Sequence, residues 1–147
     1  MVFDIMPYPE LDRNIKPSEY YLQLRIEKNA LIEDINWFLR SYGEQNSLKE
    51  IIEGSEITAW FDSEKSQVSG STGCNIYGGS YQIVGNLLSF SEIYFTEMAC
   101  ILPEGIMQQE QEFLTLLSSA QSYQADDTTL TIFCSSGQEL YFTTATR

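Results

Sequence analysis

The chain has 147 residues, with 8 Lys and Arg, 21 Asp and Glu and no His, so its formal net charge is −13 at neutral pH. This acidic balance disfavours binding to nucleic-acid phosphates and to anionic membrane surfaces, and the lack of His removes the commonest general base and zinc ligand. The length suits one globular domain, and the hydrophobic fraction of 43% is ordinary for a folded protein.

Residues 1–34 are predicted to form an N-terminal arm or linker remnant, because prolines at positions 7, 9 and 17 interrupt regular structure. The alternating pattern of Tyr20–Ile26 predicts one added strand in this arm. Met1–Pro9 shows neither the basic stretch nor the apolar run of a signal peptide, and no apolar run in the chain has the length of a membrane-spanning helix.

The next part of the chain shows the period of two that is typical of half-buried strands. Ser47 and Glu50 have the spacing of a capping box, so a short helical turn or a loop is expected there. The predicted strands and apolar segments are Trp37–Leu39, Ile57–Phe61, Ile76–Ile83 with an interruption at Gly78–Gly79, Leu88–Phe90 and Ile93–Phe95.

One segment departs from the β pattern and predicts a helix over about residues 104–119, with Pro103 and Glu104 near its first turn. Its apolar side chains recur at helical spacing, at Ile106, Phe113, Leu114, Leu117 and Ala120. The side chains expected to face water are Gln108, Gln109, Glu112 and Ser119.

Three further short strands are predicted at Tyr123, Leu130–Cys134 and Leu140–Thr143, with turns between them. The fold class that follows is mainly β (α+β): an antiparallel β-barrel-like sheet packed with one α-helix, about residues 104–119.

No catalytic, metal or cofactor site is predicted, and the chain is not expected to be an enzyme. The glycines of Gly70–Gly79 lack the Lys and the following helix of a phosphate-binding loop, so they indicate bends or bulges between strands. The numerous carboxylates are expected to be solvated surface groups; they include Asp62, Glu64, Glu97, Glu104, Glu110, Glu112, Asp126 and Asp127.

The three cysteines are Cys74, Cys100 and Cys134. Cys74 and Cys100 could form a disulfide or remain two buried thiols, whereas a metal site or a catalytic thiol is disfavoured because the chain lacks His. Cys134 lies on a predicted strand and is expected to be a small buried hydrophobic residue.

Two separated motifs stand out in the sequence. The first follows Ile57–Phe61 and runs from Val68 to Tyr81. The second is Thr96–Cys100, which precedes Pro103 and a Gln-rich helix. With these motifs the chain resembles the META domain (HslJ-like) family over about residues 35–144, which predicts a META domain at 35–147. The motif positions that the resemblance implies to be structural are Gly70, Gly73, Asn75, Tyr81, Thr96, Met98 and Ala99.

The resemblance implies a small barrel-like domain with no established enzymatic activity, usually found in exported bacterial or archaeal proteins. An oxidising compartment would favour the Cys74–Cys100 bridge. We therefore expect a non-catalytic, stress-related or secretion-related module that binds an unknown protein partner, without a cofactor and without nucleic acid. The full-length protein is expected to be periplasmic, secreted or held by a lipid anchor.

Two other functions are weighed against this expectation. The alternative is a carrier or pilot of lipids or small apolar ligands that uses a cavity inside the barrel. A hydrolase with paired carboxylates is less favoured, because the sequence singles out no such pair.

Overall fold

The structure is a computed structural model that describes residues 31–144, so the strand predicted at Tyr20–Ile26 lies outside the described residues. Residues 32–144 lie in one compact unit. Its elements, in chain order, are β1 (Asn36–Glu44), β2 (Ser47–Glu50), β3 (Thr58–Asp62), β4 (Gln67–Ser71), β5 (Ile76–Val84), β6 (Leu87–Phe95), α2 (Ile106–Ser118), β7 (Ala120–Ala125), β8 (Thr129–Cys134), the short 3-10 turn η2 (Ser135–Gly137) and β9 (Gln138–Thr143).

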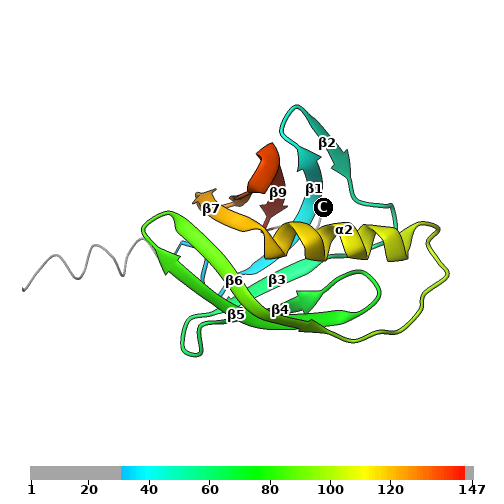
Figure 1. The fold of residues 1–147 in the computed structure, drawn as a ribbon, viewed down its shortest axis with the longest axis horizontal. Helices are drawn as coiled ribbons and strands as arrows, with labels where there is room; N and C mark the ends of the chain where they lie inside the picture. The colour runs from blue at the N-terminus through cyan, green and yellow to red at the C-terminus, as the bar shows by residue number, and fades with distance from the viewer. Residues whose placement is uncertain (1–30, 145–147) are drawn as a thin grey trace, which may run out of the picture. The chain divides into compact units, whose positions relative to one another are not determined.

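Eight of these strands close into an antiparallel barrel (Figure 1). They follow one another in the order β1, β3, β4, β5, β6, β7, β8 and β9, and β9 pairs back with β1. The predicted fold class, a mainly β antiparallel barrel with one helix, is therefore confirmed. The ninth strand, β2, pairs with the second half of β1, on the side where the first half of β1 pairs with β3.

The alternation along the strands fills the interior of the barrel with apolar side chains. In β8, for example, Leu130, Ile132 and Cys134 are buried and alternate with less buried residues. The largest fully buried side chains are Trp37, Phe61, Phe113, Phe142, Ile32, Leu39, Ile57, Leu88, Ile106, Leu117 and Leu130. They come from β1, β3, β6, β8, β9, helix α2 and two positions outside these elements, and all except Ile106 belong to one hydrophobic core.

Helix α2 runs between the β1–β2 hairpin and the β5–β6 pair (Figure 1). Phe113 and Leu117 are fully buried on it, and the Phe113 ring meets the Tyr77 ring edge-on at 5.4 Å. The helix begins at Ile106 because Gly105 has a φ of 88°, outside the helical region. No helix within residues 31–144 has the length and apolar character needed to cross a lipid bilayer.

Several local predictions were wrong. The helix falls within the predicted range, with Pro103 and Glu104 just before its first turn, but Ala120 begins β7 instead of ending the helical stripe. Ser47–Glu50 forms β2, because a tight turn after Glu44 pairs these residues with β1. Gly78–Gly79 does not interrupt β5, which continues through a register shift at this point.

Trp37 offers a test of the core. Its side chain is fully buried, and its indole N–H donates a hydrogen bond to the Ile32 carbonyl oxygen at 3.0 Å. Trp37→Ala is expected to lower the free energy of unfolding by about 3–5 kcal/mol, as is usual for a large buried aromatic. Trp60→Ala, at a partly exposed position of β3, serves as the control and should cost clearly less. Urea unfolding measures both, and equal losses would contradict this view of the core.

Candidate functional site

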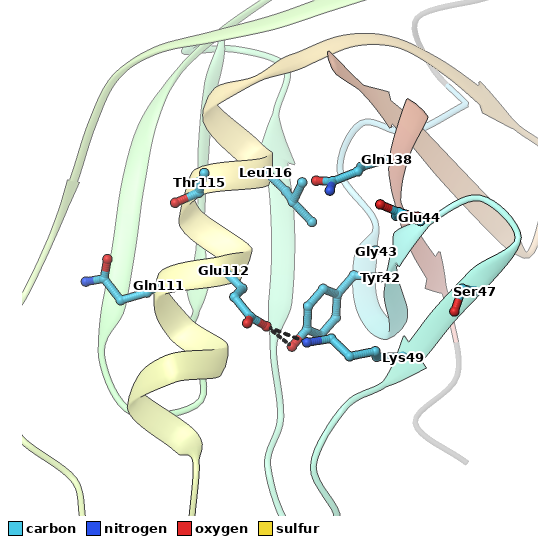
Figure 2. A pocket seen from close by; sticks show the side chains of 10 residues that line it. All are labelled: Tyr42, Gly43, Glu44, Ser47, Lys49, Gln111, Glu112, Thr115, Leu116 and Gln138. Carbon is cyan, nitrogen blue, oxygen red and sulfur yellow. Dashed lines mark hydrogen bonds and ion pairs between the residues drawn. The ribbon is translucent and has the colours of Figure 1, made fainter. Parts of the chain in front are cut away.

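A groove opens on the surface between α2 and the β1–β2 hairpin (Figure 2). Its volume is about 490 Å³. The residues that line it come from β1, the hairpin turn, β2, α2 and β9; they are Tyr42, Gly43, Glu44, Ser47, Lys49, Gln111, Glu112, Thr115, Leu116 and Gln138. Helix and hairpin thus form two facing walls.

A polar cluster crosses the groove between these walls (Figure 2). The Tyr42 hydroxyl donates a hydrogen bond to Glu112 Oε1 at 2.7 Å, and Lys49 Nζ lies 3.0 Å from the same oxygen. Lys49 also lies over the Tyr42 ring, 5.3 Å from its centroid. The hydrogen bond from Tyr42, followed by that from Lys49, lowers the pKa of Glu112, whereas burial and the Glu112 carboxylate raise the pKa of Tyr42. The carboxylate of Glu112 is therefore kept ionised within the groove.

A smaller hollow of about 250 Å³ lies on the other side of this polar cluster. It shares Tyr42, Lys49 and Glu112 with the larger groove and continues along α2 to Gly105. The two hollows together follow most of the length of the helix.

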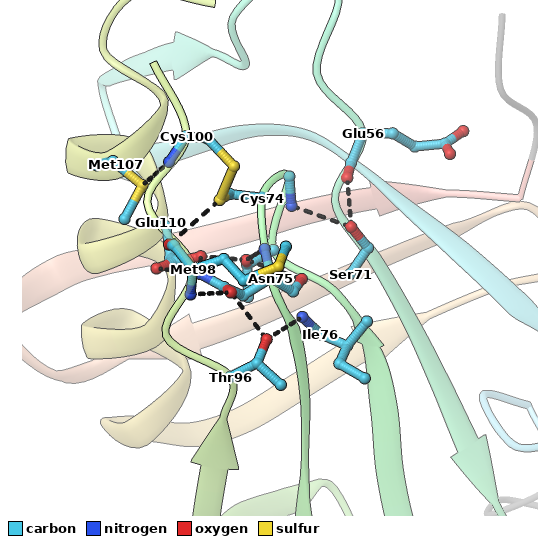
Figure 3. The surroundings of a disulfide bond; sticks show 12 residues. Glu56, Ser71, Cys74, Asn75, Ile76, Thr96, Met98, Cys100, Met107 and Glu110 are labelled. Atoms are coloured by element: carbon cyan, nitrogen blue, oxygen red, sulfur yellow. Dashed lines mark hydrogen bonds between the residues drawn. A yellow bond between two sulfur atoms is a disulfide. The ribbon is translucent and has the colours of Figure 1, made fainter. Parts of the chain in front are cut away.

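Several of the family-motif residues lie elsewhere, around the side chain of Asn75 (Figure 3). Asn75 Oδ1 accepts hydrogen bonds from the Thr96 hydroxyl at 2.8 Å and from the Met98 N–H at 2.7 Å. Asn75 Nδ2 donates to the Met98 carbonyl oxygen at 3.2 Å and to the Glu110 carboxylate at 2.9 Å. One amide side chain therefore connects the start of β5, the segment after β6 and helix α2.

Glu110 is almost completely buried at the centre of this network, with 2% of its surface exposed. Its carboxylate accepts hydrogen bonds from Asn75 Nδ2 and from the hydroxyl of Thr72, which is also buried. The prediction that Glu110 is a solvated surface carboxylate was wrong, and so was the prediction that Gln109 faces water. Burial of a carboxylate is costly unless hydrogen bonds compensate it, and these donors provide that compensation.

Cys74 and Cys100 flank the same network and are joined by a disulfide, with their Cα atoms 6.0 Å apart. The bond ties the β4–β5 connection to the segment that leads into α2 (Figure 3). Cys134 is buried on β8, as predicted, and burial raises the pKa of its thiol to about 11.

The two motif glycines have steric roles. A Cβ atom on Gly70 would lie 2.1 Å from the Thr58 carbonyl oxygen, so a larger residue would push β4 away from this backbone. Gly73 has a φ of +103°, which favours glycine, and a Cβ there would lie 3.1 Å from Ile106 of α2.

Tyr81 makes its contacts in another part of the domain. Its ring meets that of Phe61 edge-on at 5.1 Å, and its hydroxyl donates a hydrogen bond to the Glu33 carboxylate at 2.5 Å. Of the remaining motif residues, Ala99 and the side chain of Met98 are exposed. The motif residues are thus brought together in part, around Asn75, and Tyr81 stands apart.

Exposed apolar side chains cover the surface near the disulfide. Ile101 and Leu102 lie in the segment after Cys100 and are 87% and 78% exposed. Ile76, Tyr94 and Met98 are also exposed, at the start of β5, near the end of β6 and just beyond it. Sequence reasoning did not single out this surface.

Comparison with known proteins identifies the family. The sequence profile described as META domain matches residues 30–147. The chain belongs to the META domain family.

Solved structures share the fold of this META domain. A protein from Burkholderia xenovorans, solved by NMR, superposes with a TM-score of 0.67 at 24% identity, over 94% of this chain and 97% of the other. A DUF4847 family protein from Bacteroides vulgatus superposes with a TM-score of 0.59 at 16% identity, over 81% of this chain and 98% of the other. No curated protein matches the chain.

Sequence reasoning singled out the motif of the META domain but missed the groove and the position of Glu110. The signal for Glu110 was present, because position 110 falls on the helical stripe that Ile106, Phe113 and Leu117 define. The groove had no comparable signal, since its walls are far apart in the sequence and meet only in the folded domain.

Replacing the buried carboxylate tests the motif network. Glu110→Gln keeps the shape of the side chain but turns one acceptor oxygen into a donor that faces the donors Asn75 and Thr72. We expect the free energy of unfolding to fall by about 1–3 kcal/mol. The matched control, Glu112→Gln, changes a partly exposed carboxylate that Lys49 and the Tyr42 hydroxyl contact, and should cost less than about 1 kcal/mol. Similar losses in the two variants would show that the network contributes little.

Thiol counting tests the disulfide. Alkylation of the denatured, unreduced protein should modify Cys134 alone, and reduction should expose two further thiols. Because the bond spans 26 residues of sequence, reduction should lower the free energy of unfolding by about 3 kcal/mol. A Cys74→Ser/Cys100→Ser variant should be insensitive to the reductant. Three reactive thiols before reduction, in protein prepared from an oxidising compartment, would rule the bond out.

Proposed function

We propose that this META domain is a non-catalytic, stress-related or secretion-related module of an exported protein, and that it binds a segment of a partner protein. The observation that carries the proposal is the groove of about 490 Å³ between α2 and the β1–β2 hairpin. Grooves beside a helix and a strand are common sites for linear segments of other proteins. Leu116 and Tyr42 line it but are only 6% and 5% exposed, whereas Gln111, Gln138 and Ser47 supply hydrogen-bonding groups.

The state of the carboxylates supports a role in binding more than one in catalysis. Glu110 is engaged by Asn75 and Thr72 inside the domain, and Glu112 is paired with Lys49 and Tyr42. Acid–base catalysis by a carboxyl pair needs one member with a raised pKa, whereas the pKa of Glu112 is lowered. The chain contains no His that could act in their place.

Export is supported by the disulfide, because such bonds persist in oxidising compartments. The stress or secretion context rests on the family resemblance. The alternative function, an apolar ligand carried inside the barrel, receives less support from the geometry. Side chains such as Trp37, Phe61 and Phe142 occupy the interior and are fully buried. A ligand there would have to displace them from a core packed as one cluster.

Site-specific photo-crosslinking in the native host tests this function. A photoreactive residue at Thr115, which is exposed in the groove, should yield a defined crosslinked partner, whereas one at exposed Gln82 of β5 should not. Ser47→Trp, which fills the groove, should remove most of the Thr115 product, and Gln82→Trp should leave it unchanged.

A third crosslinking position shows whether a partner binds at the groove or at the apolar surface near the disulfide. If a photoreactive residue at Ile101 captures a partner and one at Thr115 does not, binding belongs to the apolar surface near the disulfide and the groove proposal fails. A Thr115 product that survives Ser47→Trp would also count against the groove.

A further inference from the structure

The free edge of β2 is unusual in this domain. Every strand of the closed barrel has a neighbour on both sides, whereas β2 pairs with β1 alone and ends the strand order among residues 31–144. Proteins normally cover or pair such an edge, because its backbone N–H and C=O groups attract other strands.

The register shows which backbone groups are on the free side. Ile51 N–H donates to the Arg40 carbonyl oxygen at 3.1 Å, so residues 47, 49 and 51 direct their backbone groups toward β1. Leu48 and Glu50, which alternate with them, direct their N–H and C=O groups away from β1. The free edge therefore presents one unpaired N–H and one unpaired C=O group from each of Leu48 and Glu50.

Helix α2 marks one end of this edge. Ile52 follows the same alternation as Leu48 and Glu50, and its N–H donates to Gln109 Oε1 on α2 at 2.8 Å. Gln109 is buried and held by a second hydrogen bond, from its Nε2 to Ser55 Oγ at 3.1 Å. A side-chain amide thus takes the position that a strand carbonyl would take, and the hollows are lined by Ser47 and Lys49, which alternate with the edge residues.

The charges around these hollows favour a cationic occupant. The acidic side chains that line them are Glu44, Glu50 and Glu112, and the one cation among the lining residues, Lys49, is already paired with Glu112. Residues 31–144 contain three basic side chains, Arg40, Lys49 and Lys65, against 16 acidic ones. A Lys or Arg side chain of a partner would therefore be attracted to Glu44 and Glu50.

We propose that the partner segment is an extended, cationic stretch of polypeptide that pairs with β2 as an added strand. This inference rests on the proposed function and specifies its chemistry. Main-chain hydrogen bonds to Leu48 and Glu50 supply the backbone contacts, and Lys or Arg side chains reach Glu44 and Glu112.

A synthetic octapeptide that alternates Arg and Val is the probe. Two further forms carry N-methyl groups on either the Arg or the Val amides, which keeps charge and side chains but removes alternate hydrogen-bond donors. The parent peptide should slow hydrogen exchange at the amides of Leu48 and Glu50. One N-methylated form should bind about tenfold more weakly, and the other should bind like the parent.

Two variants of the full chain provide the matched comparison. Leu48→Pro removes an N–H that faces away from β1, so the β1–β2 pairing is retained, and it should weaken parent binding about tenfold. Leu48→Ala keeps the N–H and should bind like the wild type. Equal binding of both N-methylated peptides, or unchanged exchange at Leu48 and Glu50, would overturn strand addition.

The results also separate this inference from the proposed function. If the Thr115 crosslink persists in Leu48→Pro and disappears in Ser47→Trp, the groove binds a partner but not by strand addition. If no crosslink forms at Thr115, the proposed function itself fails, whatever the peptide does.

Discussion

The hydrogen bonds between Asn75 and Glu110 support much of the domain's architecture. A carboxylate buried to 2% exposure would destabilise the fold without donors, and Asn75 and Thr72 provide them. Because Asn75 also binds Thr96 and Met98, the same side chain positions the segment that leads into α2. The disulfide beside it, between Cys74 and Cys100, holds the same two segments together covalently. The place of α2 on the barrel thus depends on this network.

Helix α2 connects the motif network with the groove. Glu110 and Glu112 are two residues apart, which places them on nearly opposite sides of a helix. Glu110 points toward the start of β5, and Glu112 points toward Tyr42 and Lys49 of the hairpin. A shift of the helix at the motif end would therefore move one wall of the groove. Under the proposed function, substitutions in the motif network would therefore alter binding indirectly, through the position of α2.

The sequence predicts the repeating features of this domain better than the contacts between distant segments. The period of two located most barrel strands, and the stripe of Ile106, Phe113 and Leu117 located the helix, because burial imposes these patterns directly. Ser47–Glu50 was misread, since a local capping pattern competes with a hairpin that only pairing with β1 reveals. Glu110 was placed in solvent because its partners, Asn75 and Thr72, lie more than 30 residues away. The groove could not be predicted, since its walls belong to separate segments.

The excess of negative charge bears on which segment could pair with β2. An exposed strand edge invites pairing with a second copy of the same domain. Residues 31–144 carry 16 acidic and three basic side chains, so two copies approaching through Glu44, Glu50 and Glu112 would repel each other. A cationic segment is instead attracted by the same carboxylates, which favours its binding. Within residues 31–144, the charge at the β2 edge therefore favours pairing with a basic segment over pairing with a second copy of the domain, a preference that an uncharged edge would lack.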